Sequence, residues 1–169
     1  MTSLQRRIVV IGVFGALALV LMTVGPAIWG ATVGSGWRLV VIGGSDATLG
    51  EGRPTVQVAA TPEAFTGLMT GVEAGRDVAP PDFGRYLVAV VHVGASGSCA
   101  PQLGSVDVAS ARVTVRVSRG LTISCTDDLR VYAIVLRLER AALGDGTTLA
   151  FRVEVPGRDA VDLTVPVAP

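Results

Sequence analysis

The hydrophobic pattern divides the chain into one long apolar segment followed by many short ones. The long segment, Ile8–Trp29, follows Arg6 and Arg7 and contains no charged residue. Its 22 residues are enough to cross a bilayer, because about 20 helical residues span about 30 Å of hydrocarbon. The arginines before the segment favour a cytoplasmic N-terminus. We therefore expect a transmembrane anchor within residues 1–30 and the rest of the chain outside the cell.

A cleaved signal peptide is the alternative for the same segment. Signal peptides have an apolar core of about 7–15 residues and small residues at the cleavage site. The strongly apolar part here, Ile8–Val24, has 17 residues, and Gly25-Pro26-Ala27 is a poor cleavage site. We therefore expect a single-pass protein of the cytoplasmic membrane, or a secreted protein if the segment is cleaved.

Beyond this segment, short apolar runs alternate with turn residues, a pattern typical of β structure. The Gly-rich residues 31–53 predict a linker, although Leu39–Ile42 within it suits an edge strand. The domain proper is then expected over residues 54–169. Strands are predicted at Thr55–Ala59, Tyr86–Val93, Val106–Val108, Val113–Val117, Arg130–Glu139, Thr147–Val155 and Val161–Val165.

One helix is predicted early in this domain. Thr61 is a suitable N-cap, and Pro62 fits the first helical position, where its missing N–H costs nothing. Apolar residues recur from Phe65 to Val72 at positions i, i+3, i+4 and i+7, so one helical face should cover a sheet. The elements together predict an α+β domain, mainly antiparallel, that forms a β sandwich or a small barrel with one early helix.

Charge and composition exclude some classes of function. All 14 basic residues are Arg. The part of the chain beyond Met22 contains twelve of them and fourteen acidic residues, so it is slightly acidic. No basic cluster is present, so nucleic acid is not an expected partner. Gly94–Ser98 has the glycines of a phosphate loop but lacks its Lys-Ser/Thr end. With one histidine and two cysteines, the chain also predicts no metal site and no cofactor.

Cys99 and Cys125 carry the firmest chemical prediction. In an exported chain, an even pair of cysteines is more often joined than free. We expect a structural disulfide that closes a loop of about 27 residues and stabilises the fold by roughly 3–4 kcal/mol. It would hold the 94–101 loop beside 126–130. This adjacency predicts a binding patch of Ser96, Ser98, Pro101, Asp127, Asp128, Arg130 and Tyr132.

His92 is the only histidine, and thus the only side chain with an ordinary pKa near neutrality. An exported hydrolase with a site around His92 and the 94–101 loop is the enzymatic alternative, with Ser96 or Ser98 as nucleophile and Asp127 or Asp128 as third member. No Gly-x-Ser-x-Gly elbow is present, however. We expect His92 to be a core or edge histidine and the domain not to be an enzyme.

The order of motifs adds a further expectation. A strand and capped helix over Val56–Val72 lead to Asp82-Phe83-Gly84-Arg85-Tyr86 and a Val-rich strand, and Cys125–Tyr132 lead into another apolar strand. This order, over about Thr55–Leu143, resembles the C-terminal domain of the protease complex subunit PrcB family and uncharacterised actinobacterial exported proteins. Ser98-Cys99-Ala100-Pro101 stands where that family has Gly-Gly-Tyr.

The resemblance implies a non-catalytic accessory domain outside the cell. Such a domain would bind or stabilise another protein, for example an exported protease. A purely structural envelope protein is the remaining alternative, because the even distribution of charge suits it equally well.

Overall fold

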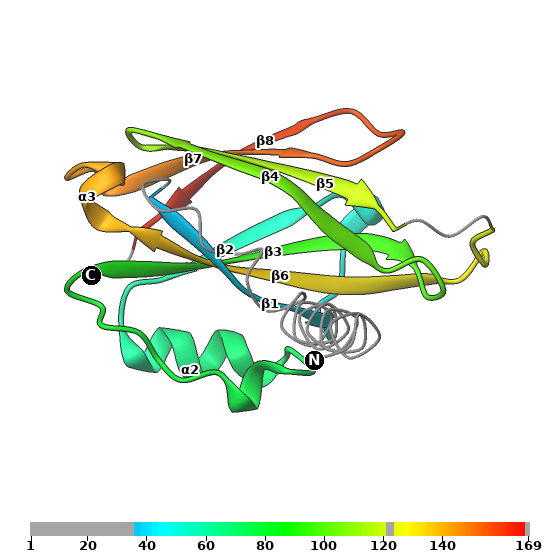
Figure 1. Ribbon diagram of the computed structural model, residues 1–169, viewed down its shortest axis with the longest axis horizontal. Coiled ribbons are helices and arrows are strands. Elements are labelled where there is room, and N and C mark those ends of the chain that lie inside the picture. Colours follow the sequence, from blue (N-terminus) through cyan, green and yellow to red (C-terminus); the bar gives the residue numbers. More distant parts are fainter. Residues whose placement is uncertain (1–35, 121–123, 168–169) are drawn as a thin grey trace, which may run out of the picture. The chain divides into compact units, whose positions relative to one another are not determined.

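The structure is a computed structural model that describes residues 36–120 and 124–167. Its strands form two four-stranded sheets that face each other (Figure 1). The first sheet has the order β1 (Trp37–Gly44), β6 (Leu129–Glu139), β3 (Tyr86–Ser96) and β2 (Thr55–Ala59). The second has the order β4 (Pro101–Ala109), β5 (Arg112–Arg119), β7 (Thr148–Glu154) and β8 (Val161–Pro166).

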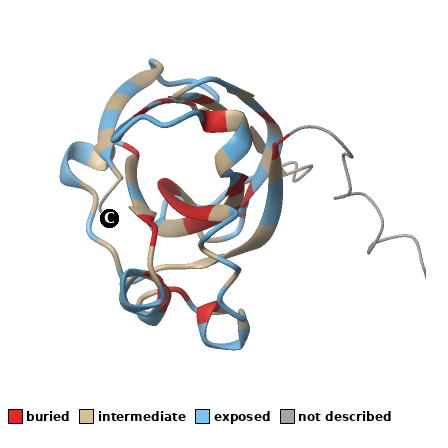
Figure 2. Cartoon of the chain, turned by 90° about the vertical axis from the view of Figure 1, so that its left-hand side faces the viewer, coloured by how far each residue is buried: buried red, intermediate tan, exposed pale blue. Residues whose placement is uncertain are grey.

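The described domain is therefore a β sandwich, as the alternating pattern predicts. All neighbours are antiparallel except β5 and β7, which run parallel. Besides the strands, the domain has the helices α2 (Pro62–Thr70) and α3 (Arg140–Leu143) and the short 3₁₀ turns η1 (Gly50–Gly52) and η2 (Gly75–Asp77). Figure 2 shows the two sheets from one end, around the interior.

The main core lies between the two sheets. Successive side chains of a strand point to opposite faces, so alternate residues of each strand meet here. Phe151 of β7 is only 1% exposed. The same cluster takes in the odd-numbered apolar residues of β3 and the even-numbered ones of β6: Leu87, Ala89, Val91, Val93, Ile134, Leu136 and Leu138.

A second core lies on the opposite face of the first sheet, which α2 covers (Figure 1). Phe65 and Met69 of the helix pack against Val88 and Val90 of β3. The Thr61 side chain caps the helix by accepting a hydrogen bond from Ala64 N at 3.2 Å. The predicted helix is confirmed, and β3 is buried on both of its faces.

The folded unit begins earlier than the sequence predicts. Strand β1 pairs with β6 from Trp37 opposite Leu138 to Gly44 opposite Tyr132. The linker predicted over 31–53 therefore contains an edge strand of the fold, and the domain does not begin at residue 54. The predicted anchor over 8–29 lies outside the described residues, within which no helix is long and apolar enough to span a membrane.

The 94–101 loop is also shorter than predicted. Strand β3 continues to Ser96, and β4 begins at Pro101, so only residues 97–100 form the turn. This turn crosses from the first sheet to the second, and the 120–128 connection crosses back at the same end of the sandwich. The two connections between the sheets thus lie side by side at one end of the sandwich.

Candidate functional site

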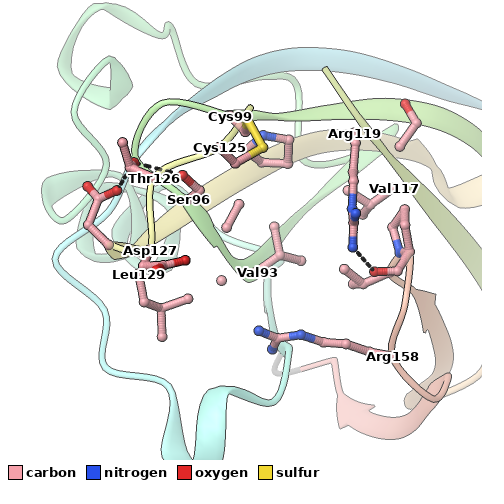
Figure 3. A pocket seen from close by; sticks show the side chains of 17 residues that line it. Val93, Ser96, Cys99, Val117, Arg119, Cys125, Thr126, Asp127, Leu129 and Arg158 are labelled. Atoms are coloured by element: carbon pink, nitrogen blue, oxygen red, sulfur yellow. Dashed lines mark hydrogen bonds between the residues drawn. A yellow bond between two sulfur atoms is a disulfide. The ribbon is translucent and has the colours of Figure 1, made fainter. Parts of the chain in front are cut away.

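A pocket of about 310 Å³ opens at the end of the sandwich where the two crossovers lie (Figure 3). Its walls come from the ends of β3 and β5, the start of β4, the segment 125–129 and the turn after β7. We call it the end pocket. Chain segments far apart in sequence supply each wall, so the end pocket depends on the complete sandwich.

The interior of the end pocket is apolar. Val93 and Val117 come from the sandwich core and Pro101 from the start of β4, and all three are buried. Leu129 stands at the rim and is 59% exposed, one of two large exposed hydrophobic side chains among the described residues. An exposed Leu beside an apolar cavity gives the ligand a continuous apolar surface.

The disulfide between Cys99 and Cys125 forms one wall of the end pocket. The Cα atoms of the two cysteines are 5.5 Å apart, and the bond joins one crossover directly to the other. The predicted disulfide is thus confirmed. It restricts the movement of both loops relative to each other and so helps to fix the shape of the end pocket.

A hydroxyl cluster links the same two loops. Ser96 Oγ and Ser98 Oγ each lie 3.0 Å from Thr126 Oγ1 and 3.2 Å from each other. The Thr126 N–H donates to Ser98 Oγ at 2.8 Å. Tyr132 supports the turn from β6, because its hydroxyl donates to the Gly97 carbonyl at 3.2 Å.

Asp128 belongs to this internal network. Its carboxylate accepts hydrogen bonds from the Thr126 hydroxyl and from Gly97 N, and Arg130 Nε lies 3.5 Å from it. These contacts, led by the Thr126 hydrogen bond, lower the pKa of Asp128. A carboxylate held by the turn in this way positions the loop and is poorly placed to bind a cation.

Two arginines complete the rim, and the sequence analysis did not single out either. Arg119, at the end of β5, donates to the Pro156 carbonyl at 3.4 Å, and Arg158 donates to the Gly52 carbonyl. Within the described ranges, neither guanidinium has a carboxylate within 4.0 Å. Arg116 and Arg152, by contrast, each contact two carboxylates.

The residues of the predicted patch do come together. Ser96, Pro101, Asp127 and Asp128 line the end pocket. The other three do not line the pocket but support its loops. Ser98 accepts a hydrogen bond from Thr126 N, Tyr132 donates one to the Gly97 carbonyl, and Arg130 pairs with Asp128. The structure thus divides the predicted patch into lining residues and supporting residues.

His92 lies elsewhere. It is 5% exposed, on the face of β3 that carries Val88 and Val90, and its Nδ1 is 3.5 Å from Thr55 Oγ1. Burial lowers its pKa. The hydroxyls of Ser96 and Ser98 bond to Thr126 instead, so no nucleophile–base pair forms from these residues. Among the described residues, no three metal-ligating side chains cluster either.

Comparisons with protein-family models, with curated proteins and with solved structures find no match to this chain. The likeness to the PrcB family therefore stays a prediction from the order of motifs. What the chain can do has to be argued from the end pocket itself.

Proposed function

We propose that this chain is a membrane-anchored, non-catalytic extracytoplasmic accessory domain that binds another protein at the end pocket. Two independent features support the location. Residues 8–29 have the length and flanking charge of an anchor, and disulfides persist mainly in oxidising compartments. The likeness to the PrcB family also suggests an accessory role.

The observation that carries the binding role is the construction of the end pocket. Apolar side chains line a preformed cavity, and Leu129 extends this surface to the rim with 59% of its area exposed. Preformed apolar pockets with a few polar groups are the usual form of binding sites. The Ser98 hydroxyl and the Asp128 carboxylate both accept hydrogen bonds from Thr126. This arrangement favours a role in holding the loops over a role in catalysis.

Photo-crosslinking in cells that express the full chain tests this proposal. A photoreactive amino acid placed at Leu129 should capture a discrete partner. The same group at Leu39, the other large exposed hydrophobic residue, which lies on the edge strand β1, is the matched control. We expect a specific adduct from position 129 alone. Equal adducts from both positions, or none from position 129, would overturn the proposal.

A further inference from the structure

The end pocket carries a more specific inference, which rests on the binding role just proposed. We propose that it binds the C-terminal end of a polypeptide whose last residue is apolar, with the terminal carboxylate held by Arg119 and Arg158. Three features support this: the state of the two arginines, the apolar side chains beside them, and the opposite charge of Asp127 across the pocket.

The two guanidinium groups are available to an anion. Each carries five N–H donors, and each has one hydrogen bond to a backbone carbonyl among the described residues. These carbonyls orient the side chains without neutralising them. Gly157, next to Arg158, has a φ of 77°, and a Cβ at this position would lie 3.1 Å from Arg119 Nη2. The glycine therefore lets the backbone pass close to the guanidinium of Arg119.

The space beside the arginines suits one apolar residue. Val93, Val117 and Val155 are the valines among the residues that line the end pocket. The whole pocket has a volume of about 310 Å³, at the small end of the range of about 300–1,000 Å³ for ligand pockets. A carboxylate that pairs with guanidinium while its side chain enters this volume would satisfy both parts of the pocket. A single anion without an apolar part, such as inorganic phosphate, would leave the apolar part empty.

The charge across the pocket sets the direction of the ligand. Figure 3 shows Asp127 and Arg119 on opposite sides of Val93, and the guanidinium of Arg158 reaches in beneath Val93. A terminal carboxylate is repelled by Asp127 and attracted by the arginines. The peptide N–H groups that precede a C-terminus are donors for a carboxylate acceptor on the opposite wall. A fatty acid has no such donors, so this wall favours a peptide.

Binding of matched peptides to the full chain in detergent micelles tests the inference. The probes are a fluorescent acetylated pentapeptide of alanines ending in leucine, its C-terminal amide, and decanoate as competitor. We expect the free acid to bind roughly tenfold or more tightly than the amide, the effect of one charge-assisted contact. The double variant R119Q/R158Q should bind acid and amide alike. Glutamine retains a donor for the Pro156 and Gly52 carbonyls.

R112Q is the matched control, because Arg112 begins the same strand whose end carries Arg119. It should bind like the wild type, and equal thermal unfolding of all variants verifies that they fold. Equal affinity for acid and amide, absence of binding, or displacement by decanoate at equal affinity would overturn the inference. Crosslinking at Leu129 that persists in R119Q/R158Q would leave the proposed binding role intact while refuting the carboxylate.

Discussion

At the scale of single residues, His92 couples the stability of the fold to pH. It is buried beside Thr55, and burial lowers its pKa below the ordinary value of 6.5. The unfolded chain therefore binds a proton more readily than the folded one. The contribution of His92 to stability is complete above a pH of about 7 and falls as the pH drops through the unfolded pKa.

We expect the free energy of unfolding to decrease between about pH 7 and pH 5, with a His92 component of at most about 1.4 kcal/mol per pH unit. H92Q should lack this component, because glutamine remains polar beside Thr55 but does not titrate. Urea unfolding of both proteins across this range measures it. The carboxylates titrate equally in both chains, so a constant difference between the two curves would contradict the prediction.

The disulfide is the second residue-scale determinant. Cys99 and Cys125 are 26 residues apart, and in the chain-entropy model such a loop stabilises the fold by about 3.5 kcal/mol. The variant C99A/C125A should lose about this much in urea unfolding, and reduction of the wild type should have a similar effect. It should also bind less at the end pocket, because the two crossovers are no longer joined. An unchanged unfolding midpoint would show that the bond adds no stability.

At the scale of elements, two glycines near α2 should respond to alanine in opposite directions. Gly67 is exposed within the helix, and a Cβ there meets nothing within 4 Å. Gly75 is buried, and a Cβ there would lie 2.4 Å from the Met69 carbonyl oxygen and 3.0 Å from Val72 Cβ. G67A should therefore stabilise the domain by about 0.5–1 kcal/mol, whereas G75A should destabilise it by roughly 1–3 kcal/mol.

Thermal and urea unfolding of the two alanine variants provide the measurement. Because each change adds one methyl group to the same region, each variant is the control for the other. A shift of the same sign in both would mean that the packing of residues 62–77 differs from the one described.

The strands could be predicted where burial imposes a clear pattern. β3 is buried along most of its length, and β5 alternates between buried and exposed residues. β1 was predicted only as a short edge strand at Leu39–Ile42 inside a linker, because none of its residues is fully buried and the two glycines at its end are typical of linkers. β4 was predicted too short because its register shifts between Leu103 and Ser105, where Gly104 interrupts the alternation.

The candidate site could be predicted in part, for a reason of chain distance. The cysteines identify two loops as neighbours, so the patch around Ser96 and Asp128 follows from the sequence. Arg119 and Arg158 come together because β5 and β7 lie parallel and adjacent, so that both strands end at the pocket. No local periodicity reports such a pairing, and each arginine alone looks like any other exposed one.

At the scale of the whole molecule, the expected location and the disulfide make linked predictions. Residues 8–29 predict an anchor, and a disulfide such as Cys99–Cys125 forms mainly in oxidising compartments. The bond is therefore a reporter of where the domain resides. We expect Arg6 and Arg7 to set the orientation by remaining in the cytoplasm, so changing them should alter the oxidation state of the two cysteines.

In a bacterial host, we expect the full chain to fractionate with membranes, to keep its N-terminal residues, and to resist thiol alkylation until it is reduced. R6E/R7E should insert less efficiently or in the reverse orientation, and a fraction of its thiols should become reactive without a reductant. Intact mass and alkylation of the two chains measure this, with R38E, beyond the apolar segment, as the control for an Arg-to-Glu change elsewhere in the chain. A mature chain that begins near Ala27 would refute the anchor but retain export. Reactive thiols in the wild type would refute export itself. An exported domain should carry the oxidised Cys99–Cys125 pair, whereas cytoplasmic thiols stay reduced.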